Sequence, residues 1–336
     1  MSGSKVCSQC KVPKPLVEFY EDASKSSGYQ SLCKICKSIY AKEYGNTPEG
    51  FAAGLVDAAR TSTKARKLKR GREDMEDCEM TPTKVLKLYR DQEGKDYYTG
   101  VRMFMSHVDD WQASLERLET KPGYIDPNTV LTALEMNGRR QWSVEKVKLL
   151  PQLVKQKVDM NQIDQFIESS KVKKQPRKRQ AVKKIGKYHY LCSWCFKKRL
   201  RRQFGSKLAK GCEVCRKKER ERYNSSFGGF ITRCISNAKA STISRNEKNR
   251  NLEFSITFDD IIDLIRQQQA RCAYSGIPLV FKPKSEWQMS IERLDNTIGY
   301  TRENICLICL EFNTDAHWSK EKFKITLDSI IDKYNL

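Results

Sequence analysis

The second half of the chain alternates between a helical and a strand-like pattern of apolar residues. Residues 258–269 (FDDIIDLIRQQQ) place apolar side chains at helical spacing behind Thr257, a candidate N-cap, and this predicts a helix. Residues 290–295 (SIERLD) alternate polar and apolar, which favours a strand, and 296–299 form the loop that returns it. Residues 304–309 (NICLIC) predict the second strand of a hairpin. The pattern therefore predicts a helix followed by a hairpin.

The same pattern occurs twice in the chain. Residues 81–146 match residues 257–322 at a constant offset of 176, without a gap. The recurring positions lie in the helix start, the hairpin and the segment after it: Thr81, Tyr98, Trp111, Ser114, Glu116, Arg117, Gly123, Tyr124, Asn128, Glu135, Asn137 and Trp142. After the second hairpin we expect a further helix to begin within 311–318. Chance does not produce such a match, so the protein consists of two tandem copies of one unit.

A segment with paired cysteines precedes each copy. The four Cys-x-x-Cys pairs comprise Cys7 and Cys10, Cys33 and Cys36, Cys192 and Cys195, and Cys212 and Cys215. The pairs enclose 22 residues in the first segment and 16 in the second. Two residues between thiolates let both sulfurs face one ion, and two such turns complete a tetrahedral zinc site. Because four protein ligands leave no open position, the two predicted Zn²⁺ ions are structural.

The net charge of the chain indicates what kind of partner it binds. Lys and Arg outnumber Asp and Glu by 63 to 41, which gives a formal net charge of +22. Such a surplus attracts polyanions, nucleic acid first among them, and a merely solvated surface is the alternative. Two basic runs, 64–72 (KARKLKRGR) and 171–184 (KVKKQPRKRQAVKK), lie between the modules, where we interpret them as arms on a phosphate backbone or as nuclear import signals. The expected partner is double-stranded DNA.

The sequence gives no sign of a membrane partner. No apolar stretch approaches the length needed to cross a bilayer, and no hydrophobic signal region follows Met1. We therefore expect a soluble, intracellular protein, nuclear or associated with DNA. In a reducing compartment the 13 cysteines are better metal ligands than disulfide partners.

The second copy resembles a known family. The string SIERLDNTIGYTRENICLICLEFN, preceded by CAYSGIPL, is similar to the HNH (His-Me finger) endonucleases in the form common among phage and large DNA virus proteins. The amino-terminal segment resembles the zinc ribbon often fused to them. The resemblance implies an α+β fold with two tandem units, each a small zinc ribbon followed by a ββα-metal (HNH-like) domain. It also implies a divalent cation held against a scissile phosphate, and hydrolysis by an activated water.

The resemblance assigns roles to single residues. Glu292 falls where the family places a strand metal ligand, and Asn313 where it places a helix metal ligand. Asn304 falls on the residue that pins the connecting loop. The equivalents in the first copy are Glu116, Asn137 and Asn128. Hard oxygen ligands of this kind suit Mg²⁺ or Mn²⁺ better than zinc.

The sequence departs from the family at the general base. Arg293 and Arg117 occupy the place of the usual histidine, and a guanidinium keeps its proton, so it can clamp a phosphate but cannot act as a base. Asp295 lies two residues along the strand from Arg293, and His317 lies four residues after Asn313, on the same face of the expected helix. Either is a candidate to activate water. A surface histidine is the alternative for His317, and a structural salt bridge is the alternative for the Glu-Arg pairs.

The family's own cysteine knuckle is incomplete in both copies. In the second copy Cys272 and Cys309 remain, with Ser275 and Phe312 in the other two positions. The corresponding positions of the first copy are Asp96, Thr99, Ala133 and Met136. We expect no zinc in either knuckle, and hydrophobic packing in its place.

These features predict five segments. They are a zinc ribbon over 1–45, an HNH-like domain over 50–160, a basic linker over 161–187, a second ribbon over 188–224 and a second HNH-like domain over 228–336. The predicted function is a metal-dependent DNA endonuclease, of nicking or mobile-element type, in which a monomer acts as a pseudo-dimer. The alternative is a non-catalytic, zinc-containing DNA-binding protein built on degenerate nuclease folds.

Overall fold

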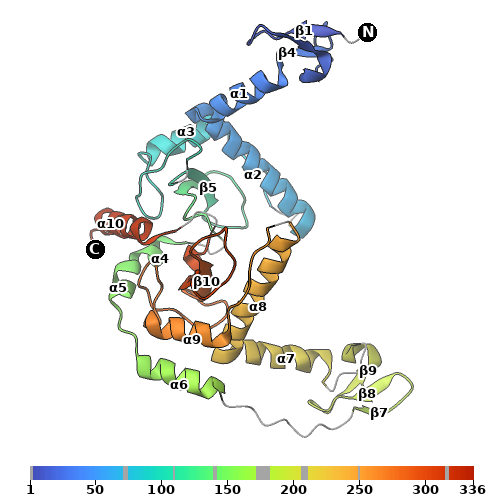
Figure 1. The fold of residues 1–336 in the computed structure, drawn as a ribbon, viewed down its shortest axis with the longest axis vertical. Helices are drawn as coiled ribbons and strands as arrows, with labels where there is room; N and C mark the ends of the chain where they lie inside the picture. Colours follow the sequence, from blue (N-terminus) through green and yellow to red (C-terminus); the bar gives the residue numbers. More distant parts are fainter. Residues whose placement is uncertain are drawn as a thin grey trace. The chain divides into compact units, whose positions relative to one another are not determined.

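The chain has a mixed α+β fold that divides into two compact units. The computed structural model describes residues 3–70, 75–108, 110–138, 142–171, 182–205, 211–248, 250–314 and 318–336 (Figure 1). The first unit comprises Met1–Lys148 with Ile325–Leu336, and the second comprises Leu149–Lys324. Among the helices of the described residues, none is long and apolar enough to cross a membrane.

The first unit begins with a small ribbon of two antiparallel strand pairs. The pairs are β1 (Ser4–Val6) with β2 (Pro13–Pro15) and β3 (Phe19–Glu21) with β4 (Tyr29–Cys33), with the 3-10 turn η1 (Leu16–Glu18) between β2 and β3. Phe19 packs against Cys7 and Cys33 in a core too small to bury much else. Helix α1 (Lys34–Gly45) follows directly.

The second unit contains the corresponding ribbon in a different sheet arrangement. Strands β7 (Lys183–Lys184), β8 (His189–Leu191) and β9 (Lys198–Leu200) form one three-stranded antiparallel sheet, followed by the 3-10 turn η2 (Arg201–Phe204) and helix α7 (Glu213–Asn224). Phe204 lies against Cys192 and Cys212, as Phe19 lies against its cysteines. Both ribbons therefore place two cysteines in a minimal core.

The two predicted hairpins are present and share one register. In the first unit β5 (Ala113–Arg117) pairs with β6 (Thr129–Ala133), and in the second β10 (Met289–Arg293) pairs with β11 (Ile305–Cys309). Glu116 faces Val130 and Glu292 faces Cys306, at the same step of each ladder. The predicted helix before each hairpin is also present: α3 (Pro82–Asp91), capped by Thr81, and α9 (Phe258–Gln267), capped by Thr257.

A long helix packs on each hairpin, α2 (Pro48–Arg70) on β5 and α8 (Phe227–Asn246) on β10. Each helix buries a threonine whose hydroxyl donates to the carbonyl four residues earlier, Thr63 in α2 and Thr242 in α8. The offset between these two threonines is 179, so the repeat extends upstream of residue 81 with a changed spacing. The basic run 64–72, which we interpreted as an arm between modules, is helical as far as residue 70.

No α-helix begins in the described part of the segment 311–318, where we expected one, namely 311–314 and 318. A 3-10 turn, η3 (Leu310–Phe312), follows β11, and Asn313 has non-helical angles (φ −88°, ψ 74°). The α-helix α10 begins only at Lys320 (Lys320–Tyr334). A tertiary contact explains the difference, because the buried Glu311 accepts a hydrogen bond from the backbone nitrogen of Trp287 at 3.0 Å. That contact turns residue 311 inward instead of leaving it in an exposed first helical turn.

Each unit also takes helical segments from the other repeat. After α4 (Val144–Lys148), the helices α5 (Leu150–Lys155) and α6 (Met160–Lys171) belong to the second unit, whereas the end of α10 belongs to the first. Arg271 donates to the carbonyl oxygens of Val154 (3.3 Å) and Gln156. The boundary between the expected domain 50–160 and the expected linker 161–187 is therefore misplaced, because α6 occupies the start of that linker.

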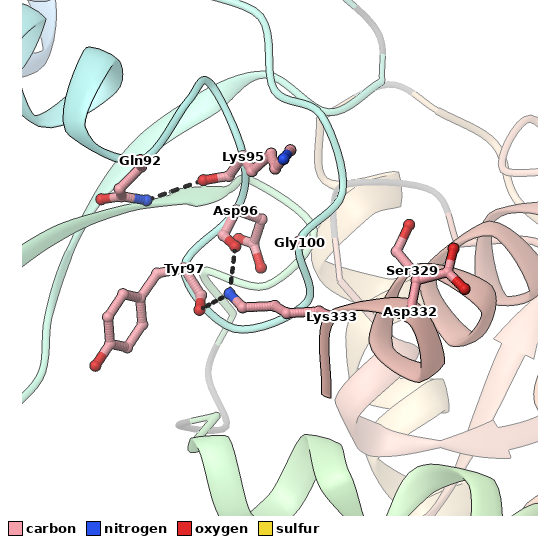
Figure 2. Close-up of a pocket in the computed structure, with 8 residues that line it drawn as sticks. All are labelled: Gln92, Lys95, Asp96, Tyr97, Gly100, Ser329, Asp332 and Lys333. Atoms are coloured by element: carbon pink, nitrogen blue, oxygen red, sulfur yellow. Dashed lines mark hydrogen bonds between the residues drawn. The ribbon is translucent and has the colours of Figure 1, made fainter. Parts of the chain in front are cut away.

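In the first unit Lys333, near the end of α10, reaches the loop after α3. Its Nζ donates to the carbonyl oxygens of Asp96 (3.2 Å) and Tyr97 (2.5 Å), as Figure 2 shows. A pocket of about 590 Å³ opens beside this contact. Its described lining includes Asp332 and Ser329 but none of the predicted metal ligands. The pocket thus reflects the way α10 docks, not the predicted site.

Candidate functional site

Each ribbon gathers its four cysteines into one cluster. The groups are Cys7, Cys10, Cys33 and Cys36, and Cys192, Cys195, Cys212 and Cys215; within each, the sulfur atoms lie within 4.8 Å of one another. The N–H of Cys33 donates to Cys7 Sγ at 3.3 Å, and chiefly for this reason the pKa of Cys7 is lowered to about 6. The N–H of Cys212 makes the same contact with Cys192 Sγ at 3.2 Å. Four converging sulfurs with N–H donors that favour the thiolate fit a structural zinc ion in each ribbon.

The hairpins present a polar face that is the same in both units. Strand alternation places Ser290 and Glu292 on one face of β10, partly exposed, and Arg293 on the other. Asn313 Nδ2 donates to Ser290 Oγ (2.9 Å) and to the carbonyl oxygen of Ile291 (3.1 Å). The structure therefore brings Asn313 and Glu292, the two predicted metal ligands, to the same face of the hairpin.

The first unit repeats this arrangement. Asn137 Nδ2 donates to Ser114 Oγ (2.5 Å) and to the carbonyl oxygen of Leu115 (3.0 Å), on the face that carries Glu116. In both units these contacts use the amide nitrogen, and the oxygen of the amide accepts no hydrogen bond from the described residues. An amide oxygen and a carboxylate on one face of a hairpin are oxygen donors of the kind that Mg²⁺ or Mn²⁺ prefers.

Burial is the main influence on the pKa of both glutamates, Glu292 and Glu116. Burial raises the pKa of Glu292, while the N–H and charge of Arg293 and the charge of Arg245 oppose the shift. Burial likewise raises the pKa of Glu116, against the charges of Arg117 and Arg66. A carboxylate removed from water in this way gains more from a bound cation than an exposed one does.

Arg293 and Arg117, which we expected to clamp a phosphate, hold the hairpin loop. Arg293, only 5% exposed, donates through Nη1 to the carbonyl oxygens of Asn296 (2.9 Å) and Ile298 (3.0 Å), and its guanidinium lies 5.3 Å from the centre of the Tyr300 ring. Arg117 donates to the carbonyl oxygen of Thr120 at 2.7 Å in the same way. These guanidinium groups are committed to the loop on the face away from the glutamates, which does not favour the phosphate-clamping role that we expected of them.

Asn304 and Asn128 make the contacts expected of residues that pin the loop. Asn304 Oδ1 accepts from the backbone nitrogen of Asp295, and its Nδ2 donates to the carbonyl oxygens of Asp295 and Gly299, each at 2.9 Å. Asn128 makes the same three bonds with Glu119 and Gly123. The loop that follows the glutamate is therefore held from both of its ends.

Of the two candidate bases, the structure describes only Asp295, and Asp295 is not placed as the sequence suggested. Strand β10 ends at Arg293, and Asp295 lies in a turn where its carboxylate accepts from the backbone nitrogen and hydroxyl of Thr297, both at 2.7 Å. These hydrogen bonds lower the pKa of Asp295, so it is a weak base. His317 lies outside the described residues, and Asn313 is not helical, so the shared helix face that linked the two is absent at Asn313.

The knuckle of the first unit is polar rather than hydrophobic, contrary to our expectation. The fully buried Asp96 accepts hydrogen bonds from the backbone nitrogens of Thr99 (2.6 Å) and Ala133 (2.7 Å) and from Thr132 Oγ1 (2.5 Å). Buried N–H groups need an acceptor, and apolar packing supplies none. In the second unit the sulfur of Cys272 accepts from the backbone nitrogen of Cys309 at 3.3 Å.

Sequence reasoning missed two residues near the glutamates, Arg66 on α2 and Arg245 on α8. Each is close enough to oppose the pKa shift of the neighbouring glutamate. The available signal is a Ser-Thr-x-x-Arg motif at 62–66 and again at 241–245. It was overlooked because its offset is 179, not the 176 that relates the hairpins.

Comparisons with known proteins give little further guidance. No protein-family model matches the chain, and no solved structure gives a significant match. The chain is 32% identical over 89 residues to a protein of Enterobacteria phage T4 described as an uncharacterized 29.0 kDa protein in the dda-modA intergenic region. The match covers 26% of this chain and about a third (32%) of the length of the phage protein. It indicates a shared segment and leaves the function to be argued from the site.

Proposed function

We propose that this protein is a metal-dependent DNA endonuclease of the HNH type, with one hydrolytic site on each hairpin. The observation that carries the proposal is the repeated polar face, in which Glu292 lies with Asn313 and Glu116 lies with Asn137. Both pairs are built on strands with identical register. Repetition of an oxygen donor set at unchanged geometry favours a function for that set over incidental surface polarity.

The residues fit a divalent cation. The carboxylate of Glu292 and the amide oxygen of Asn313 would hold it, and the cation would supply electrophilic stabilisation of the phosphate and a more acidic water. In the overall hydrolysis a water oxygen bonds to phosphorus and one ester P–O bond breaks, and the leaving oxygen takes up a proton. The loop held by Arg293 and Asn304 keeps the strand end that carries Glu292 in a fixed position.

The charge of the chain suits DNA as the substrate. The formal net charge of +22 favours association with a polyanion, and phosphate contacts by Lys and Arg make such binding dependent on salt. The helix that leaves the second ribbon, α7, is rich in exposed lysine and arginine. We therefore propose double-stranded DNA as the partner and a location on DNA.

A second candidate is a DNA-binding protein without catalysis. It is favoured by a specific observation: the arginines in the place of the family's histidine are tied to loop carbonyls, and the hydrogen bonds to Asp295 lower its pKa. On this reading the ribbons and hairpins grip the duplex, and the Glu-Asn pairs are remnants.

Plasmid cleavage distinguishes the two. Purified protein is incubated with supercoiled plasmid in Mg²⁺ or Mn²⁺, with Ca²⁺ and a chelator as controls, while binding to a labelled duplex is measured in parallel. The endonuclease proposal expects nicked or linear product in Mg²⁺ or Mn²⁺ and none with the chelator. Salt-sensitive binding without cleavage in any divalent ion would favour the second candidate.

A further inference from the structure

Arg66 and Arg245 stand out because each keeps one guanidinium donor unused at the same place in both repeats. In both residues Nη1 is buried, and it makes no hydrogen bond with the described part of the protein. The two arginines occupy equivalent positions in the last turns of α2 and α8. A buried N–H donor without a partner costs folding free energy. The same cost in both repeats points to a ligand that supplies the missing acceptor.

The neighbouring arginines show what a structural role looks like in this fold. Arg293 and Arg117 are deeply buried, and each donates to loop carbonyls beside an aromatic ring. Arg66 and Arg245 have no such partners among the residues that the structure describes. The two guanidinium groups at each hairpin therefore differ in their contacts. One donates to the loop carbonyls, and the other keeps an unpaired donor.

The place of the unpaired donor indicates the ligand. Arg245 acts electrostatically on both Glu292 and Arg293, and its helix packs on the strand that carries them. Arg66 acts in the same way on Glu116 and Arg117. Each hairpin thus has a cluster of one glutamate and two arginines. With the glutamate ionised, the cluster holds two positive charges and one negative charge. It therefore favours an anion whose oxygens can accept from a guanidinium while others bind a cation, as those of a phosphodiester do.

We infer that Arg66 and Arg245 each donate from Nη1 to a non-bridging oxygen of the phosphate held at the adjacent Glu-Asn pair. The inference rests on the proposed function and adds a phosphate contact to it. The charge on the non-bridging oxygens is stabilised by a donor atom that is already buried in the free protein, and donors placed in advance in this way contribute strongly to catalysis. Arg66 and Arg245 thus take the clamping role that Arg117 and Arg293 cannot fill.

The test compares Arg66→Gln and Arg245→Gln with a matched loss of charge on the same helices. The controls are Arg60→Gln and Lys239→Gln, since both side chains are exposed and lie outside the basic run 64–72. Three quantities are measured: the single-turnover rate of plasmid nicking in Mg²⁺ or Mn²⁺, the Kd for duplex DNA in Ca²⁺, and the thermal unfolding midpoint. Arg245→Lys is added because it keeps the charge but loses the planar fork.

The expected result separates binding and rate from stability. With both arginines replaced, we expect nicking to slow by about 100-fold or more and Kd to weaken by about tenfold, with no decrease in the unfolding midpoint. With both control residues replaced, the nicking rate and the Kd should each change by less than about threefold. Arg245→Lys in place of Arg245→Gln should recover only part of the loss.

Two outcomes overturn the inference. One is that Arg66→Gln and Arg245→Gln bind and cleave DNA no worse than the control variants. The other is an unfolding midpoint that decreases as much as in Arg293→Gln, with losses explained by the unfolded fraction. If the wild type binds DNA but never cleaves it, the proposed function fails separately. The Kd comparison then decides about the arginines, because a phosphate contact still requires the tenfold loss of affinity.

Discussion

The two hairpins share a register and a polar face, but the knuckle behind each is held by different chemistry. In the first unit the carboxylate of Asp96 bridges two backbone segments through hydrogen bonds to Thr99 and Ala133. In the second unit the thiol of Cys272 stands at that position and accepts from Cys309. The face with the Glu-Asn pair is unchanged, whereas the knuckle varies. The difference indicates that the knuckle needs only some buried acceptor, while the face needs particular groups.

The largest effect is expected in the ribbons that precede the hairpins. Elemental analysis should find two zinc ions per chain, and Cys33→Ser or Cys212→Ser should each remove one, because each cluster has four ligands. The affected ribbon should unfold, since its core is little more than two cysteines and a phenylalanine. Cys78→Ser, outside both clusters, serves as the control. Four ions per chain, or one ribbon that keeps its fold without metal, would contradict this account.

Removing the buried acceptor should destabilise the two knuckles unequally. Asp96→Ala leaves several buried donors without an acceptor and should lower the free energy of unfolding of the first unit by about 3–5 kcal/mol. Cys272→Ala removes a weaker acceptor and should cost the second unit about 1–2 kcal/mol. Urea unfolding followed by probes in each unit measures both. Equal losses would remove the distinction between the two knuckles.

The smallest effect concerns pH and the cation. Burial raises the pKa of Glu292 and of Glu116 above the unfolded value, so ionising them costs the folded protein stability as pH rises from the usual glutamate range through the raised pKa. A divalent cation opposes that cost and requires the ionised form. Mn²⁺ should therefore raise the unfolding midpoint by about 3 °C near neutral pH and by less at about pH 5.

Glu292→Gln and Glu116→Gln test whether the two hairpins contribute to this shift equally. Each variant should lose its own part of the Mn²⁺ effect, and the double variant should lose all of it. A shift that survives in the double variant would place the cation elsewhere.

Local patterns predicted the hairpins well because strand alternation and the Asn-pinned loop are encoded within a few residues. Ser290 and Glu292 lie on one, partly exposed face and Arg293 is buried on the other, which follows directly from their order in the strand. The start of the following helix was not predictable, because it depends on the contact between Glu311 and the backbone of Trp287, which is 24 residues away.

Other features could not be predicted from the sequence because they depend on packing between segments. The sequence does not say which repeat α5 or α10 packs with, since both are amphipathic segments of equivalent position. Arg66 and Arg245 were missed because the connection between helix and hairpin differs in length between the repeats. Their unused Nη1 atoms are visible only once each helix lies on its strand.

Plasmid nicking by single variants tests the central claim most directly, namely that the Glu-Asn face of each hairpin is a hydrolytic site. With Mg²⁺ or Mn²⁺, the wild type should convert supercoiled plasmid to nicked or linear product. Glu292→Ala and Asn313→Ala should each abolish cleavage of at least one strand. A wild type that binds duplex DNA with high affinity but leaves the plasmid intact in every divalent ion would contradict the claim.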